Sequence, residues 1–351
     1  MSAIFVIGLL SAILARNSID ACCYETPTPA VHFNPDMNLG VHVYTDVNFT
    51  RNFSDPDDAR KYVLRFFKSV FLRFQSAHEN LKLHLVNITF LNDTKVENEC
   101  FTLYDHHTTS LGKPVVLKYL KLDESLDKFT KCMKNSNSIA YSPGGAPLVY
   151  VLTGHDTMRT VGKEHKRWPG YSARGGVCKE NNVAIGPEKP GTFLGILAAA
   201  RLLARLLGSD YDVRRSGANA NIPDCQQARK HIMSYYEDSP DSHTFSWCSK
   251  SEMEATLKSY ACTKASGKKI DIGSDVHYPG KDLSRDNQCK RIHYKLYASG
   301  NEYRCVLGCQ TTRATGPVEE YAILDGMPCN DKSNGRCYVG ECRQDTPILR
   351  N

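Results

Sequence analysis

The sequence has few of the features that mark membrane-anchored, nucleic-acid-binding or low-complexity proteins. After residue 15, no apolar stretch is long and charge-free enough to cross a bilayer, so no membrane anchor is expected. The formal net charge of +6 is small for 351 residues, and no segment resembles a nucleic-acid-binding module. Internal repeats are absent. A hydrophobic fraction of 41% and a charged fraction of 23% are instead typical of a folded chain with about two domains.

The N-terminal segment has the pattern of a secretory signal peptide. Residues 3–15 form an apolar run that is too short to span a bilayer, and it is followed by polar residues and the small Ala21. We therefore predict a signal peptide over residues 1–21, and a mature protein that is secreted into the extracellular space.

Cysteines and glycosylation motifs agree with this localisation. The 14 cysteines predict a disulfide framework, because disulfides persist in oxidising compartments. Asn-x-Ser/Thr motifs are clustered in one part of the chain and predict glycosylation at Asn48, Asn52, Asn87 and Asn92.

The hydrophobic patterns predict strands and helices mingled along the chain, which indicates an α/β layered domain. Strands are expected at residues 39–44, 81–90, 148–152 and 182–185. A helix with a phenylalanine stripe is expected to start after Asp55, and an Ala/Leu-rich helix is expected over 192–207. Ser251 and Glu254 form a capping-box pair that predicts a third helix, through Ser259.

The C-terminal part of the chain has a different composition. Residues 263–288 are polar and are predicted to be a linker, and residues 289–351 are predicted to be a small cysteine-rich domain held by about three disulfides. Its basic segment contains Lys290, Arg291 and Lys295, which could contact a polyanion or form an ordinary solvated face.

Residues 191–212 resemble the active-site helix of a zinc protease without its zinc chemistry. In the pattern H-E-x-x-H-x-x-G-x-x-H, three histidines bind zinc and the glutamate is the general base. Gly208 and Asp212 stand where the pattern places a glycine and the residue after the third histidine. The ligand positions, however, are occupied by Arg201, Arg205 and Tyr211, and the position of the base by Leu202.

The flanking motifs extend this similarity over residues 36–262, which resemble a secreted reprolysin (adamalysin, ADAM-type) metzincin metalloprotease of the kind found in arthropod saliva and venom. The matching segments are L-T-G-H-D at 152–156, G-G-V-C at 175–178, H-I-M-S-Y-Y at 231–236, and T-F-S-W-C-S at 244–249. The tail motifs D-G-M-P-C at 325–329 and C-Y-V-G-E-C at 337–342 are similar to those of reprolysin-associated cysteine-rich modules.

The resemblance implies a metzincin-like mixed sheet followed by a small disulfide-rich domain. It implies that Met233 is the residue of the Met-turn, and that Cys178 pairs with Cys262 and Cys225 with Cys248. A further expected disulfide is Cys100 with Cys132. The family's activity is zinc-dependent hydrolysis of peptide bonds.

The four substitutions predict that this activity is lost. Arginine has five donors, no lone pair and a permanent charge, so it cannot bind zinc, and leucine cannot abstract a proton from water. We therefore expect no catalytic residue, no metal ligand and no cofactor, and a non-catalytic protein that binds or modulates extracellular host proteins. An active zinc metalloendopeptidase is the alternative, although no other H-E-x-x-H occurs in the chain. A structural matrix component is a third interpretation.

Two arginines in a cleft need compensation for their charge. An acid of the fold could pair with Arg201 and Arg205, and Asp210 and Asp212 are close in sequence. Alternatively, the pocket could open to an anionic group.

Overall fold

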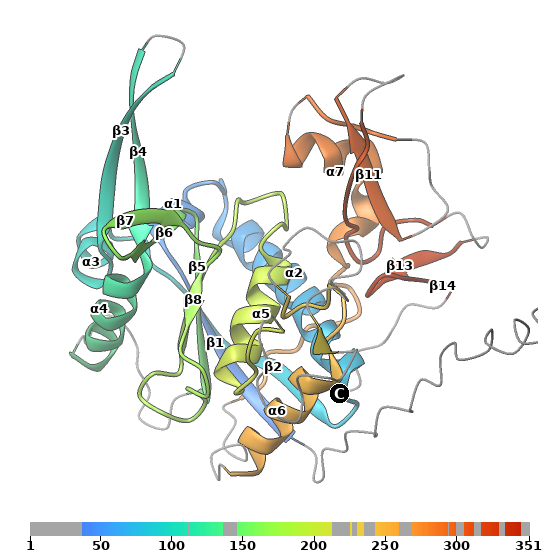
Figure 1. Ribbon diagram of the computed structural model, residues 1–351, viewed down its shortest axis with the longest axis horizontal. Coiled ribbons are helices and arrows are strands. Elements are labelled where there is room, and N and C mark those ends of the chain that lie inside the picture. The colour runs from blue at the N-terminus through green and yellow to red at the C-terminus, as the bar shows by residue number, and fades with distance from the viewer. Residues whose placement is uncertain are drawn as a thin grey trace, which may run out of the picture. The chain divides into compact units, whose positions relative to one another are not determined.

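The computed structural model (Figure 1) describes residues 37–110, 113–135, 146–212, 225–226, 230–234, 243–259, 268–293, 295–299, 305–311, 317–329 and 334–344. The predicted signal peptide lies outside these residues. Within them, no helix is both long and apolar enough to cross a membrane.

The main sheet has five strands in the order β2-β1-β5-β9-β8. Their bounds are β1 Met37–Thr45, β2 Leu81–Phe90, β5 Leu148–Thr153, β8 Tyr171–Ser172 and β9 Val183–Pro187. β2, β1, β5 and β9 pair in parallel, and β8 is antiparallel to β9. The predicted mixed α/β sheet is therefore confirmed, with the apolar run at 148–152 as its central strand.

A second sheet, with the order β3-β4-β6-β7, was not expected from the sequence. Its strands are β3 Leu103–Ser110, β4 Lys113–Lys121, β6 Asp156–Val161 and β7 Glu164–Arg167. Figure 1 shows β3 and β4 as a long hairpin. Much of this sheet is exposed and polar, so it lacks the apolar alternation that identifies a half-buried strand.

Helices cover both faces of the main sheet. α2 (Pro56–Ala77) and α5 (Ile196–Leu206) pack on one face, and α4 (Leu122–Asn135) packs on the other. Successive residues of β5 alternate between these two cores: Tyr150 joins the α2 and α5 side, whereas Val149 and Val151 join the α4 side. Both faces of the central strand are therefore buried, as is usual in a parallel sheet.

Of the three helices predicted from the sequence, one begins where it was predicted to begin and two begin elsewhere. α2 begins as predicted, because the Asp55 side chain accepts a hydrogen bond from the Asp57 amide and Pro56 occupies the first turn. α5 begins later than predicted, at Ile196. The capping-box prediction is wrong: α6 (Trp247–Lys258) begins earlier, and its N-cap is Ser246, which accepts from the Ser249 amide.

Two short helices and α4 were also missed. α1 (Val47–Thr50) and α3 (Thr94–Cys100) are too short to show a helical period. A disulfide between Cys100 and Cys132 joins α3 to α4, which confirms that predicted pair.

The C-terminal part contains small strands and three disulfides. Its elements are η4 Pro279–Asp282, α7 Arg285–Ile292, β10 Tyr297–Ala298, β11 Val306–Gln310, β12 Glu319–Ala322, β13 Arg336–Tyr338 and β14 Glu341–Arg343. The pairs are Cys289–Cys309, Cys305–Cys337 and Cys329–Cys342. The expected number of tail disulfides is confirmed, and Leu307 and Met327 add a small apolar core.

The described part of the predicted linker is packed against the rest of the chain. The Ile270 amide donates to the Leu85 carbonyl at 2.7 Å, and Lys68 Nζ donates to the Val276 carbonyl at 2.6 Å. α7 begins at Arg285, inside the predicted linker. Ile270, Ile272 and Leu283 also pack against the main core, and Tyr278 is buried, so the segment is held by both hydrogen bonds and apolar contacts.

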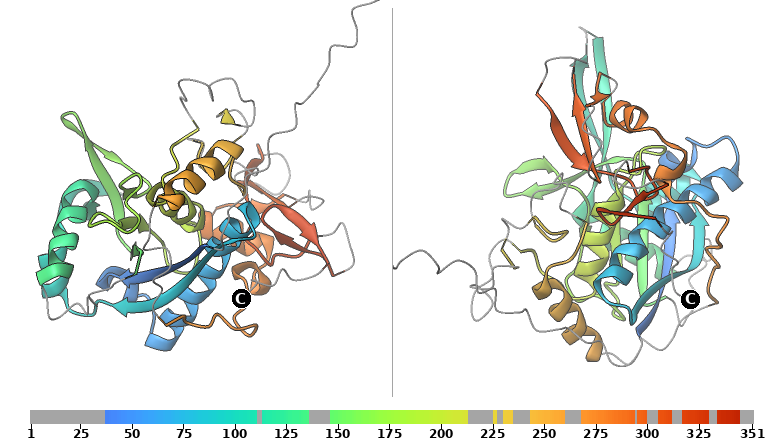
Figure 2. Two further views of the ribbon diagram at one scale, coloured as in Figure 1. Left: turned by 90° about the horizontal axis from the view of Figure 1, so that it is seen from below. Right: turned by 90° about the vertical axis from the view of Figure 1, so that its right-hand side faces the viewer.

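A buried ion pair joins α2 to the C-terminal part, and the two views of Figure 2 show these segments next to each other. Arg73 Nη1 lies 2.7 Å from Asp325 Oδ2, and both side chains are almost fully buried. The buried His243 is close enough to this ion pair to feel the charges of both Arg73 and Asp325, and its ring also packs against Gly340. Neither ring nitrogen of His243 has a hydrogen bond.

This histidine predicts a loss of stability in mild acid. Burial, helped by the charge of Arg73, lowers the pKa of His243 to about 4, although Asp325 opposes the shift. The unfolded chain binds a proton near pH 6.5, so the stabilisation is complete above that pH and is lost as the pH falls to about 4. A shift of this size corresponds to about 3 kcal/mol. Urea unfolding at pH 7 and pH 4.5 should show a smaller difference for His243→Leu than for wild type.

The exposed His107 provides a matched control. His107→Leu should keep the pH dependence of the wild-type protein, because this side chain is exposed in the fold. Equal pH dependence in wild type and His243→Leu would contradict the prediction.

Candidate functional site

The start of α5 is determined by a buried carboxylate. Glu188 follows β9 and accepts hydrogen bonds from the amides of Phe193 at 2.9 Å and Gly195 at 2.7 Å. The Tyr62 hydroxyl also donates to it, at 2.6 Å. Burial raises the pKa of Glu188 to about 7. Because these interactions hold residues 188–195 in a non-helical turn, α5 begins at Ile196 and not at Thr192.

The structure brings the predicted zinc-ligand positions together with the predicted Met-turn. Arg201 is buried on α5, and its Nε donates to the Ile232 carbonyl at 2.8 Å. One helical turn later, the Arg205 guanidinium lies over the Tyr211 ring, with its Cζ 4.6 Å from the ring centroid. The Asp212 amide donates to the Met233 carbonyl at 2.9 Å, and the Met233 side chain is fully buried.

Leu202, at the predicted position of a general base, belongs to the hydrophobic core. It is buried among residues of α2, α5 and the main sheet. A Cβ at Gly170 or Gly186 would lie 2.6 or 3.0 Å from its Cδ1. An aliphatic side chain packed in this way has no group that can accept a proton.

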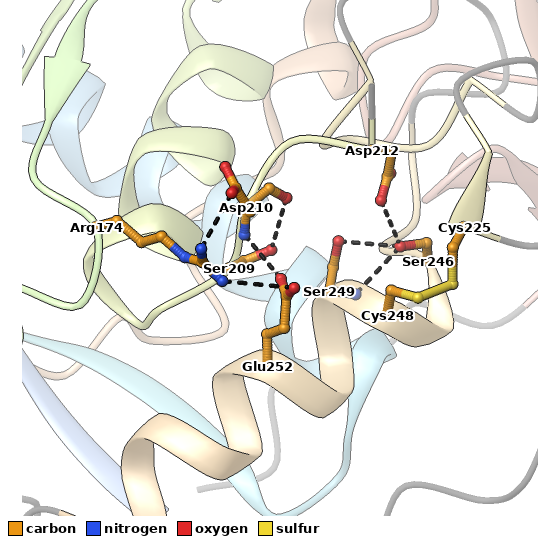
Figure 3. Close-up of a disulfide and its surroundings, with 9 residues drawn as sticks. All are labelled: Arg174, Ser209, Asp210, Asp212, Cys225, Ser246, Cys248, Ser249 and Glu252. Carbon is orange, nitrogen blue, oxygen red and sulfur yellow. Dashed lines mark hydrogen bonds and ion pairs between the residues drawn. A yellow bond between two sulfur atoms is a disulfide. The ribbon is translucent and has the colours of Figure 1, made fainter. Parts of the chain in front are cut away.

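Arg205 is compensated by an acid from the fold. Its Nη1 lies 3.3 Å from Asp210 Oδ1. Asp210 also pairs with Arg174 at 3.0 Å, and Arg174 lies 3.5 Å from Glu252 on α6 (Figure 3). The Glu252 carboxylate in turn accepts a hydrogen bond from the Asp210 amide at 2.8 Å. The positive charges of Arg174 and Arg205 are therefore compensated by the negative charges of Asp210 and Glu252.

Asp212, the other acid considered for the arginines, makes a different contact. Its Oδ1 accepts a hydrogen bond from the Ser246 hydroxyl at 2.9 Å, and Ser246 is the N-cap of α6. Cys248, in the first turn of that helix, forms the predicted disulfide with Cys225 (Figure 3). These interactions hold the segment after α5 against α6.

The remaining predicted positions are placed as follows. Cys178 is disulfide-bonded, but Cys262 lies outside the described residues, so this pairing stays a prediction. The glycosylation positions Asn52, Asn87 and Asn92 are exposed. Asn48 is half-buried, and its amide donates to the Gly154 carbonyl at 2.6 Å, so it is the least accessible of the four.

Arg174 and Glu252 are members of the site that the sequence did not reveal. Arg174 directly precedes the Gly175-Gly176 pair, and Glu252 stands among other polar residues of α6. No spacing rule connects residues so far apart in the chain. Only a model of how α6 packs beside the turn after α5 could have found them.

Comparisons with known proteins leave the family of this chain open. No family model matches the sequence, and no curated protein matches it. Among solved structures, a chaperone–substrate complex is similar with a TM-score of 0.34 and 11% sequence identity. The matched region covers 52% of this chain and 25% of the chain in that complex.

The turn after α5 depends on Gly208. This residue has φ +101°, which favours glycine, and a Cβ there would lie 1.8 Å from Thr256 Oγ1 on α6. We predict that Gly208→Ala lowers the free energy of unfolding by about 2–4 kcal/mol, since backbone strain and steric overlap add. Urea denaturation measures the change.

Gly162 is the matched control. It has φ +66°, and a Cβ there would meet nothing within 4 Å, so Gly162→Ala should lose only the backbone contribution of about 1 kcal/mol. The double variant Gly208→Ala/Thr256→Ala should recover part of the loss, because the overlap with Oγ1 and Cγ2 is removed while the one with the Thr256 Cβ at 2.7 Å remains. Equal losses at the two glycines would refute the role of Thr256.

Proposed function

We propose that this protein is a secreted, non-catalytic homologue of a reprolysin-like zinc metalloprotease, and that it acts by binding extracellular proteins. The observation that carries the proposal is the Arg205–Asp210 ion pair, with Arg205 stacked on Tyr211. Arg205 and Tyr211, at two of the three predicted ligand positions, thus contact each other. The guanidinium of Arg205 is permanently charged and repels a metal ion.

The geometry of the helix supports the same proposal. A catalytic zinc site keeps three lone-pair donors and an open position for water. Here Arg201 uses its Nε to donate to the Ile232 carbonyl, and Leu202 is packed in the core. Restoring activity would require substitutions at least at positions 201, 202 and 205, because arginine and leucine lack the chemistry of these roles and the Tyr211 oxygen cannot hold zinc alone.

Secretion is supported by the disulfides. Five pairs are formed within the described residues, and such a number is typical of extracellular proteins. We propose an extracellular protein as the partner. A polyanion contact through Lys290, Arg291 and Lys295 is a secondary proposal, and Lys290 is partly committed to an ion pair with Asp286 at 3.1 Å.

A proteolysis assay tests the loss of catalysis. The purified protein should not cleave casein or a panel of extracellular matrix proteins, with or without added zinc, under conditions in which an active reprolysin does. The reason is that Arg201, Leu202 and Arg205 supply neither a ligand nor a base, and the Tyr211 oxygen cannot hold zinc alone. Cleavage that is abolished by 1,10-phenanthroline, and that follows the protein through a second purification step, would establish the active metalloendopeptidase instead.

Solution behaviour tests the proposed binding role. Sedimentation analysis should find a monomer, whereas a matrix component would self-associate. Host extracellular proteins immobilised one at a time should identify a saturable partner, and heparin added in excess should leave that binding intact. Binding to heparin alone, lost in the triple variant Lys290→Ala/Arg291→Ala/Lys295→Ala, would replace the protein partner with a polyanion.

A further inference from the structure

A buried group of three potential metal ligands lies far from α5 in the sequence. Asp46 directly follows β1, and His155 follows β5. Since β1 and β5 are neighbouring parallel strands, their carboxyl ends meet at one edge of the sheet. Glu97 reaches the same place from α3. The three side chains each offer one ligand atom, and these atoms lie within 4.8 Å of one another.

All three side chains are removed from water. Asp46 is 0% exposed, Glu97 6% and His155 8%. Two carboxylates at such a place need a nearby cation, because a buried charge without compensation is strongly unfavourable. His155 Nε2 is 3.7 Å from Glu97 Oε1, which is beyond hydrogen-bond distance.

The imidazole Nε2 of His155 is the polar atom of this group that lacks a hydrogen bond. His155 Nε2 is buried and has no hydrogen-bond partner. Buried polar atoms of this kind are rare in native proteins and call for an explanation. A metal ion held between this nitrogen and the two carboxylates supplies one, since neutral imidazole binds metals through a ring lone pair.

The carboxylates are already held in position by their own donors. Asp46 Oδ1 accepts from the Phe49 amide at 2.7 Å and the Gly154 amide at 3.0 Å, while Oδ2 accepts from the Thr153 hydroxyl. Glu97 Oε1 accepts from the Val47 amide at 3.0 Å. Fixed outer donors of this kind orient the ligands of metal sites. Each of these carboxylate oxygens has a second lone pair, except Asp46 Oδ1, which uses both.

We propose that Asp46, Glu97 and His155 form a structural binding site for a divalent transition metal, with Zn²⁺ as the best match. One imidazole nitrogen and two carboxylate oxygens are a zinc ligand set, whereas Ca²⁺ and Mg²⁺ prefer oxygen alone. Tetrahedral bonds of about 2.1 Å separate ligand atoms by about 3.4 Å, so binding requires a modest contraction of the cluster. The site shares no residue with α5, and it does not depend on the proposed function.

The bound ion would tie α3 to the edge of the main sheet. α3 is linked to α4 by the Cys100–Cys132 disulfide, so the site and this disulfide fasten both helices. A second group, Cys305, Cys329 and Cys337, also lies within ligand distance. It is excluded because its sulfurs are used in disulfides.

Zinc titration of the chelator-treated, disulfide-intact protein tests this site. Isothermal titration calorimetry should find one Zn²⁺ per chain with a Kd below about 1 μM, and excess zinc should raise the midpoint of thermal unfolding. His155→Ala should weaken zinc binding at least 100-fold, because it removes the nitrogen ligand. The exposed His107→Ala is the matched control and should bind as wild type does.

Two additional arms keep the test decisive. If His155→Ala does not fold, Glu97→Gln replaces it, since an amide keeps the shape but loses the charge, and it should weaken binding at least 10-fold. Absence of zinc binding by the wild-type protein at 100 μM would overturn the proposal, and the three residues would then be a buried ionic cluster without a metal. Equal zinc binding by wild type and by a folded His155→Ala or Glu97→Gln would overturn it as well, because the ion would be elsewhere.

Discussion

Burial of β5 on both faces is the constraint on which the rest of the structure depends. All six of its residues are buried, with alternate side chains in the α2 and α5 core and in the α4 core. A strand in this position has no place for polar side chains along its length. Its neighbours β1 and β9 are also largely apolar, with His42 of β1 hydrogen-bonded to Thr89 of β2, so most polar groups lie at the strand ends.

The carboxyl ends of these strands therefore carry the chemistry of the molecule. Asp46 follows β1, Thr153 ends β5, and Glu188 follows β9 with its amide donating to the Thr153 carbonyl at 2.8 Å. Both carboxyl groups are fully buried and have raised pKa values, chiefly because of desolvation. Asp46 holds the loop before β6, whereas Glu188 determines where α5 begins. One sheet edge thus positions two sites of different character.

If the proposed relationship to zinc proteases holds, arginines stand where that family has histidines, and metal coordination is replaced by ion pairing, stacking and hydrogen bonding. A zinc site would hold α5, the turn after it and the Met233 segment through one metal ion. Here the same segments are held by the Arg205–Asp210 pair, the stacking of Arg205 on Tyr211, and the bond from Arg201 to the Ile232 carbonyl. These interactions hold the same elements together without a metal ion, so the packing of this region does not depend on zinc.

Local patterns in the chain were sufficient for β2, α2 and β5, because each has a strong apolar period or run and clear end signals. The Cys225–Cys248 pair was implied by the resemblance to reprolysins, whereas the six cysteines of the tail were sufficient for the number of tail disulfides. Tertiary contacts alone decided the second sheet, whose strands are mostly polar. They determined the N-cap of α6, which is Ser246 and not the predicted Ser251. They also decided which residues meet: Arg174 with Asp210 and Glu252, and Asp46 with Glu97 and His155. The physical reason is that the hydrophobic period of a helix or strand is contained in its own local sequence. Charge compensation instead depends on which segments, distant in sequence, pack side by side.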